Sequence, residues 1–186
     1  GLIMYKSLEV KKDIYWVGAL DFDLRTFDII MHSDYGTTYN SYIMKGEEKT
    51  VLFEIAKESF FDEFLERVKT VCDPKEIDYV VVSHTEPDHT GSLSKLLELN
   101  PNMEVIGSGP AIKNLKQITN RDFKSKIAKD NETIDIGGKT LKFISVPYLH
   151  WPDSMYTYIP ECKTLVTCDS FGCHYCDERV FNDKIG

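Results

Sequence analysis

The sequence has little of what several functional classes require. Its 186 residues contain no apolar run that approaches the length of a membrane-spanning helix, so we expect no membrane association. The first residues lack the apolar core and cleavage site of a secretory signal, which indicates a cytoplasmic protein. Basic residues are also scarce. The net charge of −8 at pH 7 argues against nucleic acid as a partner, because phosphate binding needs a basic surface.

Cysteine is sparse and irregularly spaced. There are five, at positions 72, 162, 168, 173 and 176. An odd number without regular spacing does not indicate a disulfide framework, and a reduced compartment is the better interpretation. Cys173 and Cys176 form a CxxC pair, which could be a redox pair or half of a zinc site. No second CxxC accompanies it, so unpaired thiols are the favoured interpretation.

What remains is an ordinary globular composition, with 42% apolar and 28% charged residues. The patterns predict strands and helices in mixed order. Strands are expected at 13–20, 38–44, 50–55, 77–83 and 104–109, and helices at 59–72, capped by Ser59, 92–99 and 110–119. Residues 132–147 and 154–169 each predict two strands joined by a turn. Hairpins combined with β-α-β alternation indicate an α/β (α+β) sandwich rather than a purely parallel sheet.

One short stretch carries unusual chemistry. After the apolar run at 77–83 comes HTEPDH, which places His84, Glu86, Asp88 and His89 within six residues. Ligand sites in α/β proteins gather at the carboxyl ends of strands. Pro87 favours extended backbone at the preceding residue, so we expect an extended strip at 84–88 with its side chains on one side, followed by a helix opening at Gly91 and Ser92.

The strip predicts a metal site rather than an incidental polar loop. No Lys or Arg lies between residues 75 and 95 to balance its carboxylates, and clustered histidines and carboxylates are typical of metal ligands. Two His-x-His units would favour zinc hydrolysis. Glu86 instead supplies a hard oxygen donor in the second position, which suits iron better.

Two later residues become candidate metal ligands because of this strip. His150 follows one predicted strand, and Asp169 ends another. A lone histidine there would more often be structural, and a lone aspartate would more often begin a turn. Both nevertheless share with His84 a position at the end of a predicted strand, so we include them as candidate ligands.

The residues resemble a known family. YGTTYNSYIM, HTEPDHTGSL, LHWPDSM and TLVTCDSFGCHYCDERVFND together are similar to the flavodiiron proteins, or A-type flavoproteins, over essentially the whole chain. The resemblance implies a metallo-β-lactamase-like αβ/βα four-layer sandwich across residues 1–186. It also implies a non-haem diiron centre that reduces O₂ to water or NO to N₂O.

The resemblance also assigns the ligands. It implies that His84, Glu86 and His150 bind one iron, that Asp88 and His89 bind the other, and that Asp169 bridges the two. His174 fits a pocket position beside the metals. Electrons would come from FMN in a flavodoxin-like domain, with rubredoxin or a similar protein as the donor. The full-length enzyme would be a head-to-tail homodimer.

Two features of that family are expected outside this sequence. The flavodoxin-like domain is one, and a further histidine ligand to the second iron is the other. We therefore expect a partial domain whose second half is incomplete and whose 186 residues alone do not turn over substrate. Two alternatives stay open. One is a dinuclear hydrolase of the metallo-β-lactamase superfamily, which should have histidine in place of Glu86, and the other is a non-catalytic remnant.

Overall fold

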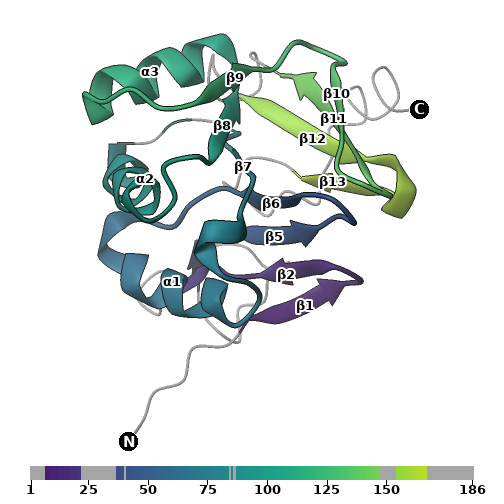
Figure 1. Cartoon of the computed structure of the whole chain (residues 1–186), viewed down its shortest axis with the longest axis horizontal. Coiled ribbons are helices and arrows are strands. Elements are labelled where there is room, and N and C mark those ends of the chain that lie inside the picture. Colours follow the sequence, from purple (N-terminus) through teal and green to yellow (C-terminus); the bar gives the residue numbers. More distant parts are fainter. Residues whose placement is uncertain are drawn as a thin grey trace, which may run out of the picture.

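Two stacked sheets, a separate two-stranded pair and three helices are the main elements of the described part of the protein. The computed structural model describes residues 7–21, 37–39, 41–83, 85, 87–146 and 154–166. Figure 1 shows the three helices on one face of the larger sheet and the smaller sheet on its other face. None of the described helices is long and apolar enough to cross a bilayer.

The larger sheet has seven strands in the order β1-β2-β5-β6-β7-β8-β9. Its first four strands are antiparallel neighbours, and β6 to β9 are parallel. The strands are Leu8–Lys11 (β1), Ile14–Trp16 (β2), Tyr42–Lys45 (β5), Thr50–Phe53 (β6), Tyr79–Val81 (β7), Glu104–Gly107 (β8) and Ser125–Ile127 (β9).

One helix follows each of three parallel strands. These helices are Phe61–Lys69 (α1), Pro87–Leu99 (α2) and Gly109–Thr119 (α3), and they connect β6 to β7, β7 to β8 and β8 to β9. Parallel crossovers are right-handed in almost all proteins. Because the strands advance in one direction across the sheet, right-handed crossovers put all three helices on the same face, as Figure 1 shows.

The smaller sheet is an antiparallel meander in the order β10-β11-β12-β13. Its strands are Thr133–Asp135 (β10), Thr140–Ser145 (β11), Met155–Ile159 (β12) and Thr164–Val166 (β13). A separate pair joins Ala19–Asp21 (β3) and Thr37–Tyr39 (β4). Three short 3₁₀ turns complete the described elements, at Glu58–Phe60 (η2), Pro74–Glu76 (η3) and Pro160–Cys162 (η4).

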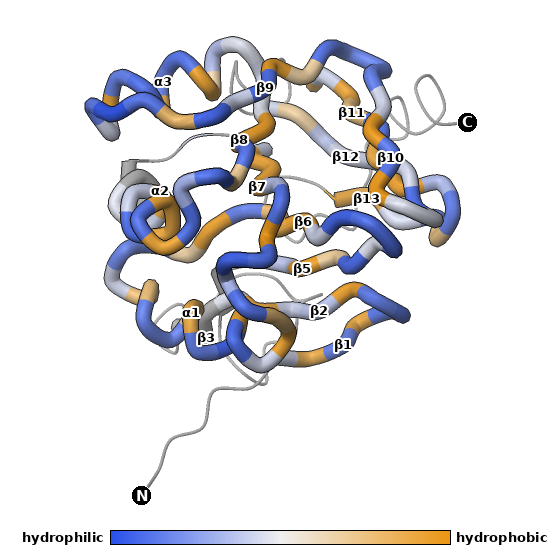
Figure 2. The backbone as a smooth tube through the Cα atoms, viewed as in Figure 1, coloured by the Kyte–Doolittle hydropathy of each residue, from blue (hydrophilic) through white to orange (hydrophobic). Residues whose placement is uncertain are grey.

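The central strands are apolar throughout because both of their faces are covered. Successive side chains of a strand point to opposite faces. Leu52 of β6 therefore packs with the helices, whereas Val51 and Phe53 pack against the smaller sheet. Figure 2 shows this distribution as apolar stretches along the strands and a hydrophilic turn between β5 and β6. The continuous apolar run in the sequence thus reflects a sheet buried on both sides.

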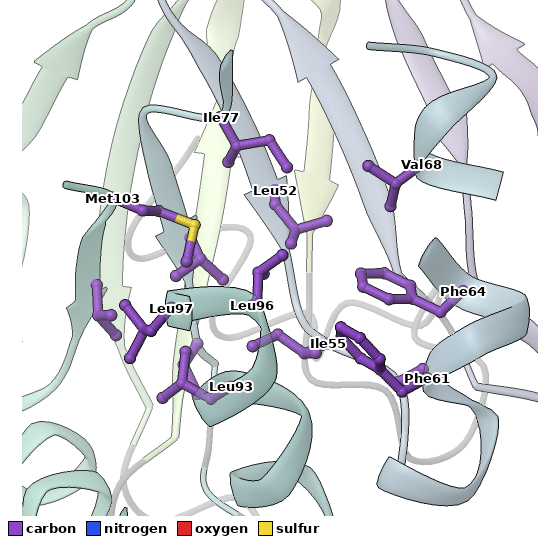
Figure 3. Close-up of a cluster of buried hydrophobic side chains, with 14 of the residues drawn as sticks. Leu52, Ile55, Phe61, Phe64, Val68, Ile77, Leu93, Leu96, Leu97 and Met103 are labelled. Carbon is purple, nitrogen blue, oxygen red and sulfur yellow. The ribbon is translucent and has the colours of Figure 1, made fainter. Parts of the chain in front are cut away.

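Helices α1 and α2 each pack a row of buried apolar side chains against this face of the sheet. Phe61, Phe64 and Val68 of α1 are all buried, and Figure 3 shows them directed toward the sheet beside Leu93 and Leu96 of α2. Burying one such side chain contributes about 1.5–3 kcal/mol. The helical spacing of these residues therefore orients both helices on the sheet.

The two sheets also meet at their turns. The backbone N–H groups of Glu47 and Glu48 donate to the carbonyls of Gly137 and Ile136. A Cβ at Gly46 would overlap the carbonyl oxygen of Ile136, so the two turns approach closely only because residue 46 is glycine. Gly137 also has a φ of +89°, which glycine adopts at low cost.

The predicted sandwich is confirmed, and so are most of its elements. Four of the predicted elements need correction. Residues 38–44 do not form one strand, because residues 37–39 (β4) pair with β3 whereas residues 42–45 (β5) belong to the larger sheet. Residues 13–20 do not form one strand, because the chain leaves β2 at Trp16 and enters a different sheet at Ala19. Ser59 does not cap α1, which begins at Phe61 after η2. The helix expected from Ser92 begins instead at Pro87.

Candidate metal centre

The predicted ligand strip follows β7 in the chain, and the described residues on either side of it show how it is held. Val80 and Val81 are fully buried, and the chain remains buried through Ser83 before it reaches the strip. Helix α2 begins at Pro87, four residues after Ser83. Ser83 and Pro87, the described residues on either side of His84 and Glu86, thus both belong to packed parts of the fold.

The early start of α2 corrects the expectation of an extended strip over residues 84–88. Asp88 and His89 lie in the first turn of a helix, so their spacing from the preceding residues follows helical geometry. The physical reason is Pro87. Its fixed φ suits the first position of a helix, where its missing N–H costs nothing. Proline also disfavours helical backbone at the residue before it, which was the basis of the expected strip. That restriction applies to residue 86 and does not extend to Asp88.

A buried carboxyl group holds the backbone at the start of this connection. The N–H of Ser83 donates to Glu54 Oε1, and Glu54 is only 5% exposed. Glu54 directly follows β6, and its own N–H donates to the carbonyl of Val81 at 3.0 Å. Its φ of +63° is left-handed, which is unfavourable for any residue with a Cβ. The neighbouring strand ends β6 and β7 are therefore joined by specific contacts.

Sequence reasoning missed Glu54. The available signal was an acidic residue directly after the apolar run TVLF, at the carboxyl end of a predicted strand. His84 likewise comes after an apolar run at the carboxyl end of a predicted strand, and that position is part of what makes it a candidate ligand.

A second contact brings the smaller sheet to this edge. The N–H of Met155, the first residue of β12, donates to the carbonyl of Ser83 at 2.8 Å. The N–H of Val146, just after β11, donates to the carbonyl of Ser154 at 3.2 Å. The segment 147–153 therefore leaves and re-enters the described fold beside the residue that precedes His84.

Buried hydroxyl groups near this edge have no hydrogen-bond partner in the described structure. They are the Oγ atoms of Ser83, Ser92 and Ser154, each on a residue at most 1% exposed. Ser83 directly precedes His84, and Ser92 lies one turn after His89 in α2. A buried polar atom without a partner is costly and uncommon, so each one calls for a physical explanation.

A cavity of about 300 Å³ opens near the same edge. It lies where β8 and β9 end and α3 begins, between the two sheets. Its wall includes Ser108, Lys129, Phe143, Ser145 and Ser154. Ser108 caps α3, since its hydroxyl accepts the N–H of Ala111 at 3.2 Å. The cavity lining therefore combines polar and charged side chains with apolar ones.

The ligand assignments stay predictions. His84, Glu86, His150, Asp169 and His174 lie outside the described residues. Asp88 and His89 are placed by their position in α2 alone. Among the side chains that the structure describes, no group of three or more His, Cys, Asp or Glu residues could hold a metal ion.

The surroundings nevertheless fit a metal centre. The strip offers two imidazoles and two carboxylates at a strand end, the donor types that bind iron and zinc. The unpartnered hydroxyls of Ser83 and Ser154 fit as outer hydrogen-bonding groups, which metal-ligating side chains commonly require.

A protein-family model described as "ODP family beta lactamase" matches residues 37–185. The chain belongs to this family. The flavo-diiron protein FprA2 of Clostridium acetobutylicum is 50% identical over 181 residues, which make up 96% of this chain and 45% of that protein. The type A flavoprotein fprA of Rhodobacter capsulatus is 38% identical over 180 residues, or 95% of this chain and 41% of that protein.

Solved structures place this ODP-family chain in the same group. The flavodiiron protein of Giardia intestinalis matches with a TM-score of 0.80 and 36% identity, over 96% of this chain and 44% of that one. Rubredoxin oxygen:oxidoreductase from the anaerobe Desulfovibrio gigas matches with a TM-score of 0.78 and 32% identity, over 91% of this chain and 43% of that one. The resemblance to flavodiiron proteins and the metallo-β-lactamase-like fold are thereby confirmed. The chain spans less than half the length of these relatives.

Proposed function

We propose that this protein is an oxidoreductase that reduces O₂ to water, or NO to N₂O, at a non-haem diiron centre. The observation that carries the proposal is the contact between Met155 N–H and the Ser83 carbonyl. It joins the strand end that leads into His84 to the strand that follows the His150 segment. Residues expected to share one metal centre thus come from neighbouring parts of one edge, although they lie far apart in the sequence.

The proposed ligands are those that the resemblance implies. His84, Glu86 and His150 would hold one iron, Asp88 and His89 the other, and Asp169 would bridge them. His174 would line the pocket beside them. Bound at this edge, two iron ions would supply the electrons and the open coordination positions that reduction of O₂ or NO requires.

The buried strand ends would serve this centre by holding its ligands in place. Glu54 fixes the backbone at Ser83, and the apolar layers on either side limit the access of water. A site built on rigid elements keeps its ligands in a productive geometry. The contribution of the described residues is therefore orientation and exclusion of water.

The electron path extends beyond these residues. Relatives of more than twice this length include type A flavoproteins, which supports FMN bound in a flavodoxin-like domain outside residues 1–186. The name of the Desulfovibrio gigas protein supports rubredoxin as a donor for this protein too. We also propose a head-to-tail homodimer in the cytoplasm, with residues 1–186 as part of its diiron domain.

The test is anaerobic metal analysis of the intact protein together with reductant-driven consumption of NO and O₂. We expect two iron ions per chain and turnover with at least one of the two gases. Residues 1–186 prepared alone should bind less iron and show no turnover. An intact protein that carries zinc and hydrolyses esters or lactams, without reducing either gas, would refute the proposal in favour of the hydrolase alternative.

Glu86→His separates the two chemistries within one chain. The substitution supplies the imidazole that a zinc hydrolase would have at this position, so we expect the ratio of bound zinc to bound iron to rise when both metals are offered. Glu86→Gln is the matched control, because it removes the charge without adding an imidazole. An unchanged ratio in Glu86→His would show that this position does not select the metal.

A further inference from the structure

Ser83 and Ser154 share an unusual combination of properties. Their exposed fractions are 1% each, and neither Oγ atom has a hydrogen-bond partner among the described residues. Leaving a buried hydroxyl without a partner costs about 1–3 kcal/mol. Alanine would fill nearly the same space at these two positions without that cost.

The backbone of both serines is fixed, in contrast to their hydroxyls. Ser83 donates its N–H to Glu54 and accepts the N–H of Met155 at its carbonyl. The carbonyl of Ser154 accepts the N–H of Val146. Each hydroxyl is therefore held in one region, next to the predicted ligand segments at 84–89 and 147–153.

We propose that Ser83 and Ser154 are positioning residues for the metal ligands, and that their hydroxyls hydrogen-bond to ligand side chains when the metal is bound. The inference rests on the proposed function. Ligating histidines almost always donate their second ring N–H to an outer partner, and ligating carboxylates also accept hydrogen bonds. A hydroxyl can serve either kind of ligand, because it both donates and accepts.

Thr157 provides a control within the same strand as Met155. Its Oγ1 is also buried without a partner among the described residues, and its residue is 0% exposed. It lies three residues beyond Ser154 and pairs with Phe143 and Val166 within the sheet. Thr157→Val removes this hydroxyl with almost no change of shape, at a residue that does not adjoin segments 84–89 or 147–153 in the sequence.

The test compares Ser83→Ala, Ser154→Ala and Thr157→Val in the intact protein. Anaerobic titration with Fe²⁺ gives the metal affinity, and thermal unfolding of the metal-free protein gives the stability. We expect Ser83→Ala and Ser154→Ala to weaken Fe²⁺ binding by about 10–100-fold. The same variants should match or exceed the stability of the metal-free wild type, since they remove an unpartnered hydroxyl. Thr157→Val should bind Fe²⁺ as the wild type does.

Co²⁺ supplies a second measurement that does not depend on turnover. Its visible absorption bands report the geometry of the ligands around it. Ser83→Ala and Ser154→Ala should shift these bands, and Thr157→Val should leave them unchanged. Restoring the hydroxyl with Ser154→Thr should return the bands toward those of the wild type.

The possible failures are distinguishable. Wild-type Fe²⁺ affinity and unchanged Co²⁺ bands in both serine variants would overturn this inference and leave the proposed function standing. Equal loss of affinity in Thr157→Val would also overturn it, because the effect would then belong to the strand as a whole. Absence of Fe²⁺ binding by the wild-type protein would overturn the proposed function and this inference with it.

Discussion

Glu54 allows a sharp test of how the strand ends are held together. Its carboxyl group accepts the buried N–H of Ser83, and its backbone has a left-handed φ of +63°. The two features together predict that alanine and glycine at position 54 differ in their effect on stability. Substitution by alanine removes the acceptor and keeps the backbone strain, whereas substitution by glycine removes both.

The magnitudes follow from these two contributions. Losing the acceptor for a buried N–H costs about 1–3 kcal/mol, and it affects the alanine and glycine variants alike. A Cβ in the left-handed region costs about 1–2 kcal/mol, which glycine avoids. The greater conformational freedom of glycine in the unfolded chain offsets about 0.5–1 kcal/mol of this advantage. We therefore expect Glu54→Gly to be more stable than Glu54→Ala by about 0.5–1 kcal/mol.

Urea unfolding of the metal-free protein measures this difference. Glu54→Gln should be the most stable of the three variants because it keeps an acceptor oxygen. Lys163 is the control for the backbone contribution alone, since it has a φ of +49° and lies at an exposed turn. Lys163→Gly should likewise be more stable than Lys163→Ala. An alanine variant at position 54 as stable as the wild type, or more stable than the glycine variant, would refute this reasoning.

Three further substitutions test other parts of the fold. Gly46→Ala should destabilise the protein by about 1–3 kcal/mol in urea unfolding, because its Cβ would meet the carbonyl of Ile136. Gly109→Ala is the control and should be neutral, since the nearest atom to its Cβ outside its own helix lies at 3.9 Å. Burial raises the pKa of the Cys72 thiol from 9.0 to about 11, so the unfolded chain loses this proton at lower pH than the folded protein. The stability of the wild type relative to Cys72→Ser should therefore fall as the pH rises from 9 to 11. An equal pH dependence of both proteins would contradict the shift. Asn100→Ala should cost about 1–3 kcal/mol, since the side-chain amide donates to two buried backbone carbonyls at 2.8 and 3.0 Å, and a wild-type melting temperature would argue against this role.

Much of the fold could be predicted because local patterns agree with the tertiary structure. The apolar runs at 50–55 and 77–83 predicted strands, and these are β6 and β7. The spacing of Phe61, Phe64 and Val68 predicted a helix that packs on the sheet. Strands β1 and β9 were missed, because β1 is exposed along its length and β9 has only three residues at an edge. The alternation in β1 covers only four residues and β9 has a single apolar residue, so neither pattern is long enough to stand out.

The sequence by itself determined the chemistry that this protein can offer. The donor types of HTEPDH, and the position of the motif directly after an apolar strand, are enough to indicate a metal site. Helix geometry at Pro87 corrects the spacing of Asp88 and His89, because a proline that disfavours helix for the residue before it also favours a helix that starts with it.

Only the tertiary structure decided which distant segments share the edge where that chemistry lies. Glu54 and Met155 contact Ser83 across 29 and 72 residues of sequence. No local pattern encodes such contacts, since they depend on how β6 and β7 end and β12 begins at one edge when the two sheets stack. The unpartnered hydroxyls of Ser83 and Ser154 were likewise invisible in the sequence, because burial is a property of the packed sheets and not of a serine or its neighbours.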